Sequence, residues 1–403
     1  GNYTIWDSVL YEKAAFQPNL TLLLNTSVAD ASCENGLIGS VKAWQLTSQT
    51  WVTVEATQFI DCSGDSILAP LTGAEHRWGR ESREEFGEDI QPAEADSKTM
   101  GNSLLIQIRK TEEPVKFTAP KWAYKFRSPE EIHCRMGGVN GHNFWWIELG
   151  GLDNTIRDAE KIRHELYRTS YGVWDYIKNR CPEKDKAENW ALEWLGSLPG
   201  KRENRRYVGP HIMTQHDVRS RGQFEDMVAY GGWSMDDHHP AGLLYPGRPT
   251  IFHPAPSPYG IPLRSLYSNN IRNLWFAGRN ISVTHAALSS TRVMATCAVI
   301  GQATGTAAAF CVREEMAPSA IYPARVRDLQ EMLMLDDCYL PGMARPATEL
   351  TKSAKIKGGV DIDHLVNGVD RDLGETSNCW VGEVGERLEM SWERPQEVRS
   401  VRL

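Results

Sequence analysis

One stretch, residues 273–310, limits what this chain can fold into more than any other part of the sequence. It opens with an apolar run typical of a buried strand, Asn273-Leu-Trp-Phe-Ala277, which ends at the turn Gly278-Arg279-Asn280. No charged residue falls between Arg292 and Arg313, so the sequence predicts a long helix that is buried on most sides. The helix is built from Ala, Gly and Thr, and such small residues allow another backbone or a flat cofactor to approach closely.

The start of this helix is a candidate ligand site. Ser289, Ser290 and Thr291 are good capping residues, and a helix start leaves N–H groups free and partly positive, which suits an electron-rich ligand atom. A core helix without a ligand is an equally valid interpretation. A membrane span is another, because roughly 18 apolar residues suffice and Gly301-x-x-x-Gly305 is a membrane packing motif. The scattered Thr and Gln residues argue against the span, and no second apolar stretch accompanies it.

The run from Asn273 to Ala309 resembles the C-terminal flavin-binding segment of the FAD-dependent oxidoreductases, and it is closest to a bacterial subgroup. The resemblance implies FAD as the cofactor. It also implies that the strand returns to a dinucleotide-binding sheet and that the helix start meets the pyrimidine edge of the flavin. The family usually carries Gly-Asp where this chain has Gly-Arg. The flavin contacts predicted on this basis are Gly278, Arg279, Asn280, Ser290, Arg292, Val293 and Met294.

A second segment, Phe59-Ile-Asp-Cys-Ser-Gly-Asp65, resembles the family signature in which a strand ends at a small-Gly turn beside the cofactor. Glycine at such a turn lets the backbone pass close to a ligand. Asp65 is predicted to bond a ribose hydroxyl, and an ordinary turn in which it caps the next helix is the alternative. Val28 matches the family position beside the adenine. This resemblance adds Val28, Ser63, Gly64 and Asp65 to the predicted cofactor site.

The glycine fingerprint that normally opens such a protein is missing. A strand, a G-x-G-x-x-G turn, a helix and an acidic residue about 20 positions later are expected, and none stands before Asn25. We therefore expect an N-terminally truncated chain without the pyrophosphate cradle, and a weakened affinity for FAD.

The resulting fold prediction is α/β, with an FAD/NAD(P)-binding domain of the glutathione-reductase type that lacks its first βαβ unit. This partial domain comprises residues 1–75 and 266–316, with an inserted α+β substrate domain at 76–265. A helix and linker at 317–345 follow. Short β-like runs at 346–403 resemble the first half of a discoidin-like jelly roll, a module that often binds sugars.

Within these domains the apolar spacing predicts individual elements. Asn35-Gly36 predicts a hairpin turn, and Gly247 to Pro262 predicts an ordered loop. We expect an amphipathic helix at 4–15, with Trp6, Val9 and Leu10 on one side, and further helices at 153–179 and 323–335. The predicted strands are 20–24, 25–33, 36–46, 51–62, 100–109 and 141–150.

The chemistry that the resemblance implies is two-electron transfer, as hydride, between an organic small molecule and the flavin. Histidine suits proton transfer near neutral pH. His285, on the expected loop before the helix, is therefore the first acid/base candidate, although it could equally pack or cap. His238 held by Asp236 is the second. Arg219 and Arg292 are candidates for holding an anionic substrate, and structural ion pairs are the alternative for both.

The run Asp236-Asp-His-His239 also raises the question of a metal site. Neighbouring residues point in different directions, so four consecutive ligands rarely converge, and we expect no metal. A solvated loop and a substrate-facing histidine both stay open for this run.

Net charge and cysteine usage limit the partners and the compartment that we expect for the protein. A formal charge of −8 argues against nucleic acid or an anionic membrane. The eight cysteines are scattered without C-x-x-C, which favours free thiols in a reducing, cytoplasmic compartment, with a secreted or periplasmic location as the alternative. The partner we expect is a small molecule, carbohydrate-derived if the sugar-binding resemblance holds.

Two other classes of function stay open. One is a carbohydrate-binding or scaffold protein that has lost its cofactor, which the missing fingerprint would suit. The other is a hydrolase, although the Ser-rich turn near Ser289 is not a G-x-S-x-G elbow.

Overall fold

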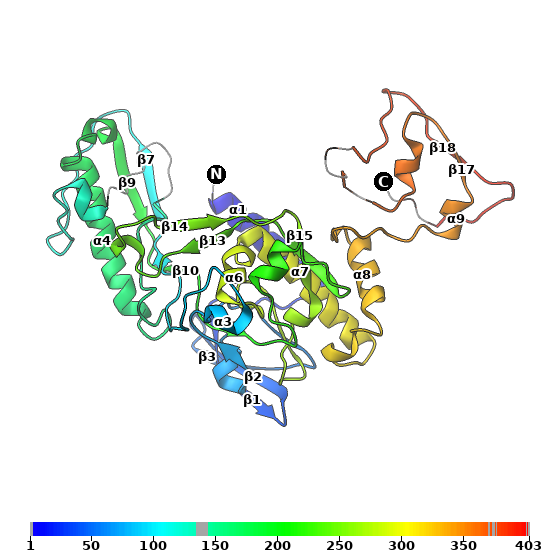
Figure 1. Cartoon of the computed structure of the whole chain (residues 1–403), viewed down its shortest axis with the longest axis horizontal. Helices are drawn as coiled ribbons and strands as arrows, with labels where there is room; N and C mark the ends of the chain where they lie inside the picture. Colours follow the sequence, from blue (N-terminus) through cyan, green and yellow to red (C-terminus); the bar gives the residue numbers. More distant parts are fainter. Residues whose placement is uncertain are drawn as a thin grey trace.

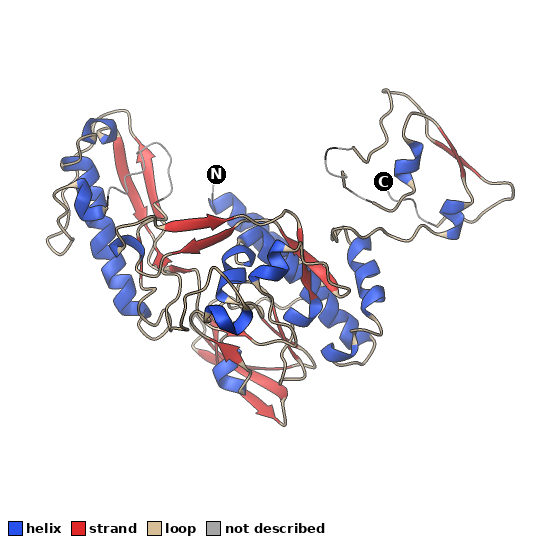
Figure 2. Cartoon of the chain, in the orientation of Figure 1, coloured by secondary structure: helices blue, strands red, loops and turns tan. Residues whose placement is uncertain are grey.

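The computed structural model describes residues 3–133, 144–369, 371, 372, 375, 377–399 and 401. Figures 1 and 2 show a mixed α/β chain of helices and mostly short strands. The α-helices of the described residues are α1 (Tyr3–Ala15), α2 (Leu68–Thr72), α3 (Arg83–Phe86), α4 (Ala159–Asn179), α5 (Gln215–Arg219), α6 (His285–Thr291), α7 (Met294–Arg313), α8 (Val326–Leu335) and α9 (Glu349–Lys352).

The strands of the same residues are mostly short and pair mainly in twos and threes. They are β1 (Thr26–Glu34), β2 (Leu37–Gln45), β3 (Thr50–Glu55), β4 (Phe59–Asp61), β5 (His76–Arg77), β6 (Asn102–Ser103), β7 (Ile106–Lys110), β8 (Glu148–Leu149), β9 (Trp190–Leu195), β10 (Gly200–Lys201), β11 (Arg206–Tyr207), β12 (Met227–Gly231), β13 (Met235–His238), β14 (Thr250–His253), β15 (Tyr259–Pro262), β16 (Leu274–Phe276), β17 (Lys355–Lys357) and β18 (Glu389–Ser391).

The strand predicted before Gly278 is present as β16. β16 runs parallel to β4, with Leu274 opposite Phe59 and Phe276 opposite Asp61. Parallel strands are buried on both faces and therefore read as continuous apolar runs, and Leu274, Trp275 and Phe276 are all fully buried. The two turns that follow these strands are therefore held at the same edge of the sheet.

An antiparallel sheet precedes this pair, in the order β1-β2-β3. Its first turn confirms the predicted hairpin, because Asn35 and Gly36 both have positive φ, 52° and 70°. Glycine is needed at the second position, since a Cβ on Gly36 would lie 2.8 Å from the carbonyl oxygen of Asn270.

The prediction that this helix is buried on most sides is wrong, because α7 packs one face against the core and leaves the other open. Ile300, Ala303, Ala307 and Phe310 are buried at helical spacing and join the main hydrophobic cluster. Among the described residues, α7 is the single helix long and apolar enough to cross a membrane. Its packing against β12, β16 and α8 is that of a core helix.

A second hydrophobic cluster lies around α4, which Figure 1 shows beside β7 and β9. Leu166, Val173, Trp174 and Ile177 point inward at the spacing expected from the sequence. The described core residues thus form two clusters, one around β16 and α7 and one around α4.

Two predictions near the start of the chain are wrong. The helix α1 forms, but Trp6, Val9 and Leu10 are 63%, 41% and 52% exposed, so it buries no apolar face. Residues 20–24 form no strand, and Leu20 to Leu24 lie at the surface. A strand exists only where a neighbour completes its ladder, and none of the described strands pairs with this segment.

Other elements differ in their bounds. The predicted strand 51–62 divides into β3 and β4, and 100–109 divides into β6 and β7. Only β8 forms within 144–150, and residues 141–143 lie outside the described part. The helix predicted from 153 begins at Ala159, and the one predicted from 323 begins at Val326. The expected loop 247–262 contains β14 and β15 because their partners, β13 and β12, lie beside it.

The long helix expected to begin near residues 290–292 begins at Met294, and residues 285–291 before it form the separate helix α6. Val293 is extended, with φ −69° and ψ 146°, and α7 begins at Met294. His285 is therefore the first residue of α6 and does not lie in a loop, because Thr284 caps that helix by accepting a hydrogen bond from the N–H of Ala287.

The C-terminal segment, orange to red in Figure 1, contains α9 and one antiparallel pair, β17 with β18. An isolated bridge joins Val360 and Val381. These described elements do not confirm the predicted jelly roll, which would require two packed sheets.

Candidate active site

The turn after β16 has the geometry of a close-approach site. Gly278 has φ +98°, and a Cβ added there would meet no heavy atom nearer than the Asn280 Oδ1, at 3.7 Å. That oxygen is buried and has no hydrogen-bond partner among the described residues. An open glycine beside an unpaired buried acceptor leaves room and hydrogen-bonding capacity for a ligand.

Arg279 connects this turn to the one after β4. Its guanidinium donates to the carbonyl oxygen of Gly64, to the Oδ1 of Asp65 at 2.7 Å, and to the carbonyl oxygen of Lys201 at 3.1 Å. Gly64 has φ +70°, a conformation that favours glycine, and a Cβ there would lie 2.5 Å from the Arg279 Nη1 and displace that guanidinium. The two predicted cofactor segments are therefore in direct contact, as the resemblance implied.

Asp65 itself is fully engaged by the protein. Its carboxylate accepts hydrogen bonds from Lys201, from the side-chain amide of Asn204 at 2.5 Å and from Arg279. The helix α2 is instead held by Asp61, whose Oδ2 accepts from the N–H of Leu68 at 3.0 Å. The Asp65 carboxylate is thus held by protein donors, and it does not cap α2.

The remaining two residues of the first cofactor segment occupy different environments. Ser63 is exposed, and its Oγ accepts from the N–H groups of Asp65 and Ile67 at 3.3 and 3.2 Å. Val28, on β1, is half-buried against the main core.

The first turn of α7 is open. None of the described residues accepts a hydrogen bond from the backbone N–H groups of Met294, Ala295 or Thr296. Met294 is 89% exposed, and Val293 before it is half-buried. Free N–H groups at the positive end of a 20-residue helix favour an electron-rich ligand atom.

Two arginines border this helix start. Burial raises the pKa of Cys297, on the first turns of α7, to about 11, and the positive charges of Arg279 and Arg292 act in the opposite direction. Both guanidinium groups therefore lie near that turn. Arg292 donates to the carbonyl oxygen of Asp236 at 3.1 Å, and its buried Nε has no partner among the described residues.

Ser290 does not face this opening. Its hydroxyl donates to the carbonyl oxygen of Trp233 at 2.5 Å and lies 2.5 Å from the hydroxyl of Tyr259. Buried and doubly engaged, it fixes α6 against β15.

His285 is buried between two carboxylates. Its Nδ1 lies 2.8 Å from the Oε2 of Glu203, and its Nε2 lies 3.1 Å from the Oδ1 of Asp237. Burial lowers the pKa of the imidazole, but the charge of Glu203 and the hydrogen bonds to Asp237 and Glu203 outweigh this effect and raise it to about 10. The ring is thus an imidazolium at neutral pH.

His238 has the same arrangement. Its Nδ1 lies 2.7 Å from the Oε2 of Glu148, and its Nε2 lies 3.2 Å from the Oδ2 of Asp236. The pKa of Asp236 is lowered, because the hydrogen bond and charge of His238 outweigh the effect of burial. The predicted pairing of His238 with Asp236 is therefore present, with Glu148 as a second carboxylate that the sequence did not indicate.

The strand β13 links the two histidines. Successive side chains of a strand point to opposite faces, so Asp236 meets His238 while Asp237 meets His285. His239 stacks on Tyr245 at 3.6 Å between ring centroids. The four consecutive residues do not converge, and the part of the chain that the structure describes contains no group of His, Cys, Asp or Glu that could hold a metal ion.

Arg206 and Glu81 complete the buried charge cluster. Arg206 is 1% exposed and donates to Glu203 and to the Oε1 of Glu81 at 2.7 Å. The Oε2 of Glu81 accepts from the backbone N–H of His285 at 2.9 Å. The sequence analysis did not name these groups as site residues, because a charged run such as Lys201 to Arg206 ordinarily indicates a solvated face.

Arg219 lies elsewhere. It ends α5 and pairs with Asp89 at 2.6 Å, and its side chain is 36% exposed. The structure pairs it with none of the other predicted site residues.

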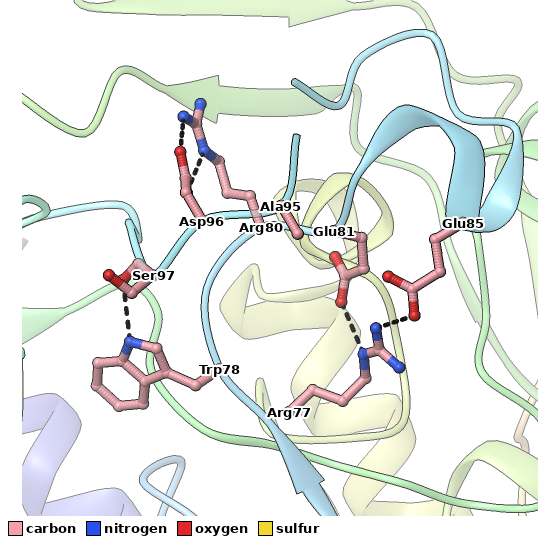
Figure 3. A pocket seen from close by; sticks show the side chains of 8 residues that line it. All are labelled: Arg77, Trp78, Arg80, Glu81, Glu85, Ala95, Asp96 and Ser97. Atoms are coloured by element: carbon pink, nitrogen blue, oxygen red, sulfur yellow. Dashed lines mark hydrogen bonds and ion pairs between the residues drawn. The ribbon is translucent and has the colours of Figure 1, made fainter. Parts of the chain in front are cut away.

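A cavity of about 370 Å³ is lined by Glu81 of the buried cluster and by other charged residues. Figure 3 shows the side chains that line it. Arg80 pairs with Asp96, and the indole N–H of Trp78 donates to the carbonyl oxygen of Ser97 at 3.0 Å. Arg80 also lies close enough to Asp237 to lower the pKa of that carboxyl, although burial and His285 have larger effects. The cavity therefore opens beside the His285 cluster.

The parallel β4–β16 pair, the open glycine turn and the uncapped start of a long helix are features expected of a protein that binds a nucleotide cofactor. The chain belongs to the FAD dependent oxidoreductase family, whose model matches residues 2–333. That family binds FAD, and the unpaired N–H groups of α7 and the unpaired oxygen of Asn280 fit such a group. Its general function is accordingly that of a flavin-dependent oxidoreductase. No curated protein and no solved structure matches the chain.

Proposed function

We propose that this protein transfers two electrons, as hydride, between a small polar organic substrate and FAD. The observation that carries the proposal is the open first turn of α7, with its three free N–H groups beside Arg279 and Arg292. FAD, when bound, supplies the redox chemistry, and the protein supplies position and electrostatics.

The chain's own groups have separate roles in this proposal. The N–H groups of Met294, Ala295 and Thr296 and the guanidinium of Arg292 would stabilise negative charge at the electron-rich edge of the cofactor. The turn at Gly278 and Asn280 would leave room for the cofactor to approach the backbone closely. Arg279 acts as a positioning residue, since its donors hold the Gly64 turn and the Asp65 carboxylate in place.

His285 contributes a fixed positive charge rather than a freely titrating ring, because both nitrogens are hydrogen-bonded to carboxylates. We propose that it orients Asp237, and that Asp237 is the group that exchanges a proton with the substrate. The Asp237 side chain is 20% exposed, whereas those of His285 and Glu203 are 2% and 0% exposed. His238 and Asp236 would position Arg292 in the same way, through the contact between Arg292 and Asp236.

The substrate that we propose is a polyhydroxylated molecule derived from a carbohydrate, held in the cavity of Figure 3. Supporting this, the cavity is lined by charged groups that exchange hydrogen bonds and by the indole of Trp78. An indole face combined with polar groups suits a ligand that has both C–H and hydroxyl faces.

The test is a titration of the purified chain with FAD, followed by the fluorescence and visible absorbance of the flavin. We expect the flavin fluorescence to be quenched and the flavin absorption band at about 450 nm to shift on binding. Anaerobic addition of candidate sugars or polyols should then bleach the band. A chain that leaves the FAD spectrum unchanged at saturating protein would overturn the proposal, and binding without bleaching by any polyol would overturn the substrate class alone.

A further inference from the structure

A second cavity lies against α4. It has a volume of about 420 Å³ and is bounded by α4, by the 3-10 turn η3 (Gly242–Leu244) and by the segment 124–131. Small-molecule sites typically have volumes of about 300–1,000 Å³ and mostly apolar linings. The apolar part of this lining includes Tyr124, Phe126, Leu149, Leu152, Ile162 and Leu244.

This cavity is separate from the histidine cluster, although the two share a wall. Glu148 and Leu149 are consecutive residues of β8, so their side chains point to opposite faces. Glu148 meets His238 at 2.7 Å, whereas Leu149 lines the cavity. The wall is tight, because a Cβ on Gly242 would lie 2.1 Å from the carbonyl oxygen of Glu148. An occupant of the cavity therefore does not touch the proposed flavin and substrate groups.

The charged lining favours a cation. Three carboxylates line the cavity, those of Glu131, Asp153 and Glu165, against one ammonium group, that of Lys161. Lys161 is already paired with Asp153 at 2.9 Å. Glu165 accepts a hydrogen bond from the hydroxyl of Tyr124 and pairs with Arg168 at 3.2 Å, and both interactions keep the pKa of the carboxyl low despite partial burial. Glu131 is the lining carboxylate for which the described residues supply no ion pair.

The mouth is open and apolar. Leu152 and Leu244 line the cavity and are 57% and 66% exposed, although leucine side chains of this size are usually buried. Since the surrounding groups are acidic and the walls are apolar and aromatic, the best matched occupant has an apolar ring and a positively charged head.

We propose that the cavity between α4 and η3 is a second ligand site, which binds a small aromatic molecule bearing an ammonium group. Its walls would enclose the ring, and Glu165 and Glu131 would face the ammonium group. The site is independent of the flavin proposal, because its lining shares no residue with the groups assigned to FAD.

The experiment uses phenethylammonium as the probe and phenylacetate as its anionic counterpart, each titrated into the whole chain by calorimetry. We expect phenethylammonium to bind at least about tenfold more tightly, a difference of about 1.4 kcal/mol. Equal affinities for the two compounds, or no binding heat with either compound at millimolar concentrations, would overturn the proposal.

Two variants with matched controls locate the site. Leu244→Arg places a positive charge at the mouth and should abolish phenethylammonium binding, whereas Leu198→Arg, at a residue 84% exposed and outside the lining, should not. Glu165→Gln should weaken the binding of phenethylammonium and leave that of phenylacetate unchanged. Glu160→Gln, on the exposed side of α4, should change the binding of neither compound. Unchanged binding in both Leu244→Arg and Glu165→Gln would place the probe elsewhere and overturn the assignment.

Discussion

Replacement of Met294 by proline tests the open helix start most directly. Met294 is the first residue of α7, a position at which proline fits because its N–H has no partner within the helix. Val293 already has ψ 146°, the extended conformation that a residue before proline prefers. Met294→Pro therefore removes one hydrogen-bond donor from the proposed flavin site and leaves the helix intact.

The expected loss follows from one hydrogen bond. A hydrogen bond to a charged or strongly electron-rich acceptor contributes about 1.5–3 kcal/mol. Since every 1.4 kcal/mol is about tenfold in affinity, Met294→Pro should weaken FAD binding about 10- to 100-fold. The melting temperature without FAD should not fall, because proline at this position restricts the unfolded chain without straining the folded one.

The assay is quenching of FAD fluorescence, with Met294→Ala as the matched control. The alanine variant also removes the side chain, which is 89% exposed, but keeps the N–H. If Met294→Pro binds FAD as tightly as Met294→Ala, the α7 N–H groups do not contact the cofactor and the reasoning is refuted. A lowered melting temperature in Met294→Pro alone would show that the helix start was disturbed.

Three further predictions concern stability and the remaining arginine. Gly64→Ala should destabilise the fold by about 1–3 kcal/mol and weaken FAD binding, because Gly64 has φ +70° and a Cβ would meet Arg279. Gly73→Ala is the control, since Gly73 has φ +74° but no neighbour within 4 Å of an added Cβ. Chemical denaturation of both variants separates the cost of backbone strain from the cost of the clash. His285→Gln should cost about 3–5 kcal/mol, since it leaves buried carboxylates without their cation. The folded-state pKa of His285, about 10, lies above the unfolded value of about 6.5. The contribution of His285 to stability is therefore fully present below pH ~6.5 and is lost as the pH rises through ~10. A difference in unfolding free energy between wild type and variant, measured in urea, that stays constant from pH 6 to pH 10 would contradict this prediction. Arg219→Ala should change stability by at most about 1 kcal/mol and leave FAD binding intact. If this variant instead raises the KM for an anionic substrate without changing the melting temperature, Arg219 contacts the substrate after all.

Several features were determined by the sequence itself. The apolar run before Gly278 predicted a strand, and β16 forms there beside β4. Asn35-Gly36 predicted a hairpin, and both residues have the positive φ that it needs. The helix α4 presents its predicted apolar face to a core. These outcomes depend on local sequence, namely on the period of the apolar residues and on the backbone preferences of Asn and Gly.

The burial of apolar runs was not determined locally. Leu20 to Leu24 have the composition of a buried strand yet lie exposed, because no described strand pairs with them. The charged run from Lys201 to Arg206 shows the reverse, since Glu203 and Arg206 are 0% and 1% exposed. Whether a segment is covered depends on what distant parts of the chain supply, which periodicity does not record.

The candidate site was decided by the tertiary structure for the same reason. The sequence indicated His285, but its partners Glu203 and Asp237 lie 82 and 48 positions away, and only the fold brings the three together. Their proximity changes the chemistry, because two carboxylates convert a histidine that would titrate near neutral pH into a fixed cation. Local sequence specified which groups can carry charge, whereas the low-polarity interior and the distances within it decided which charges persist.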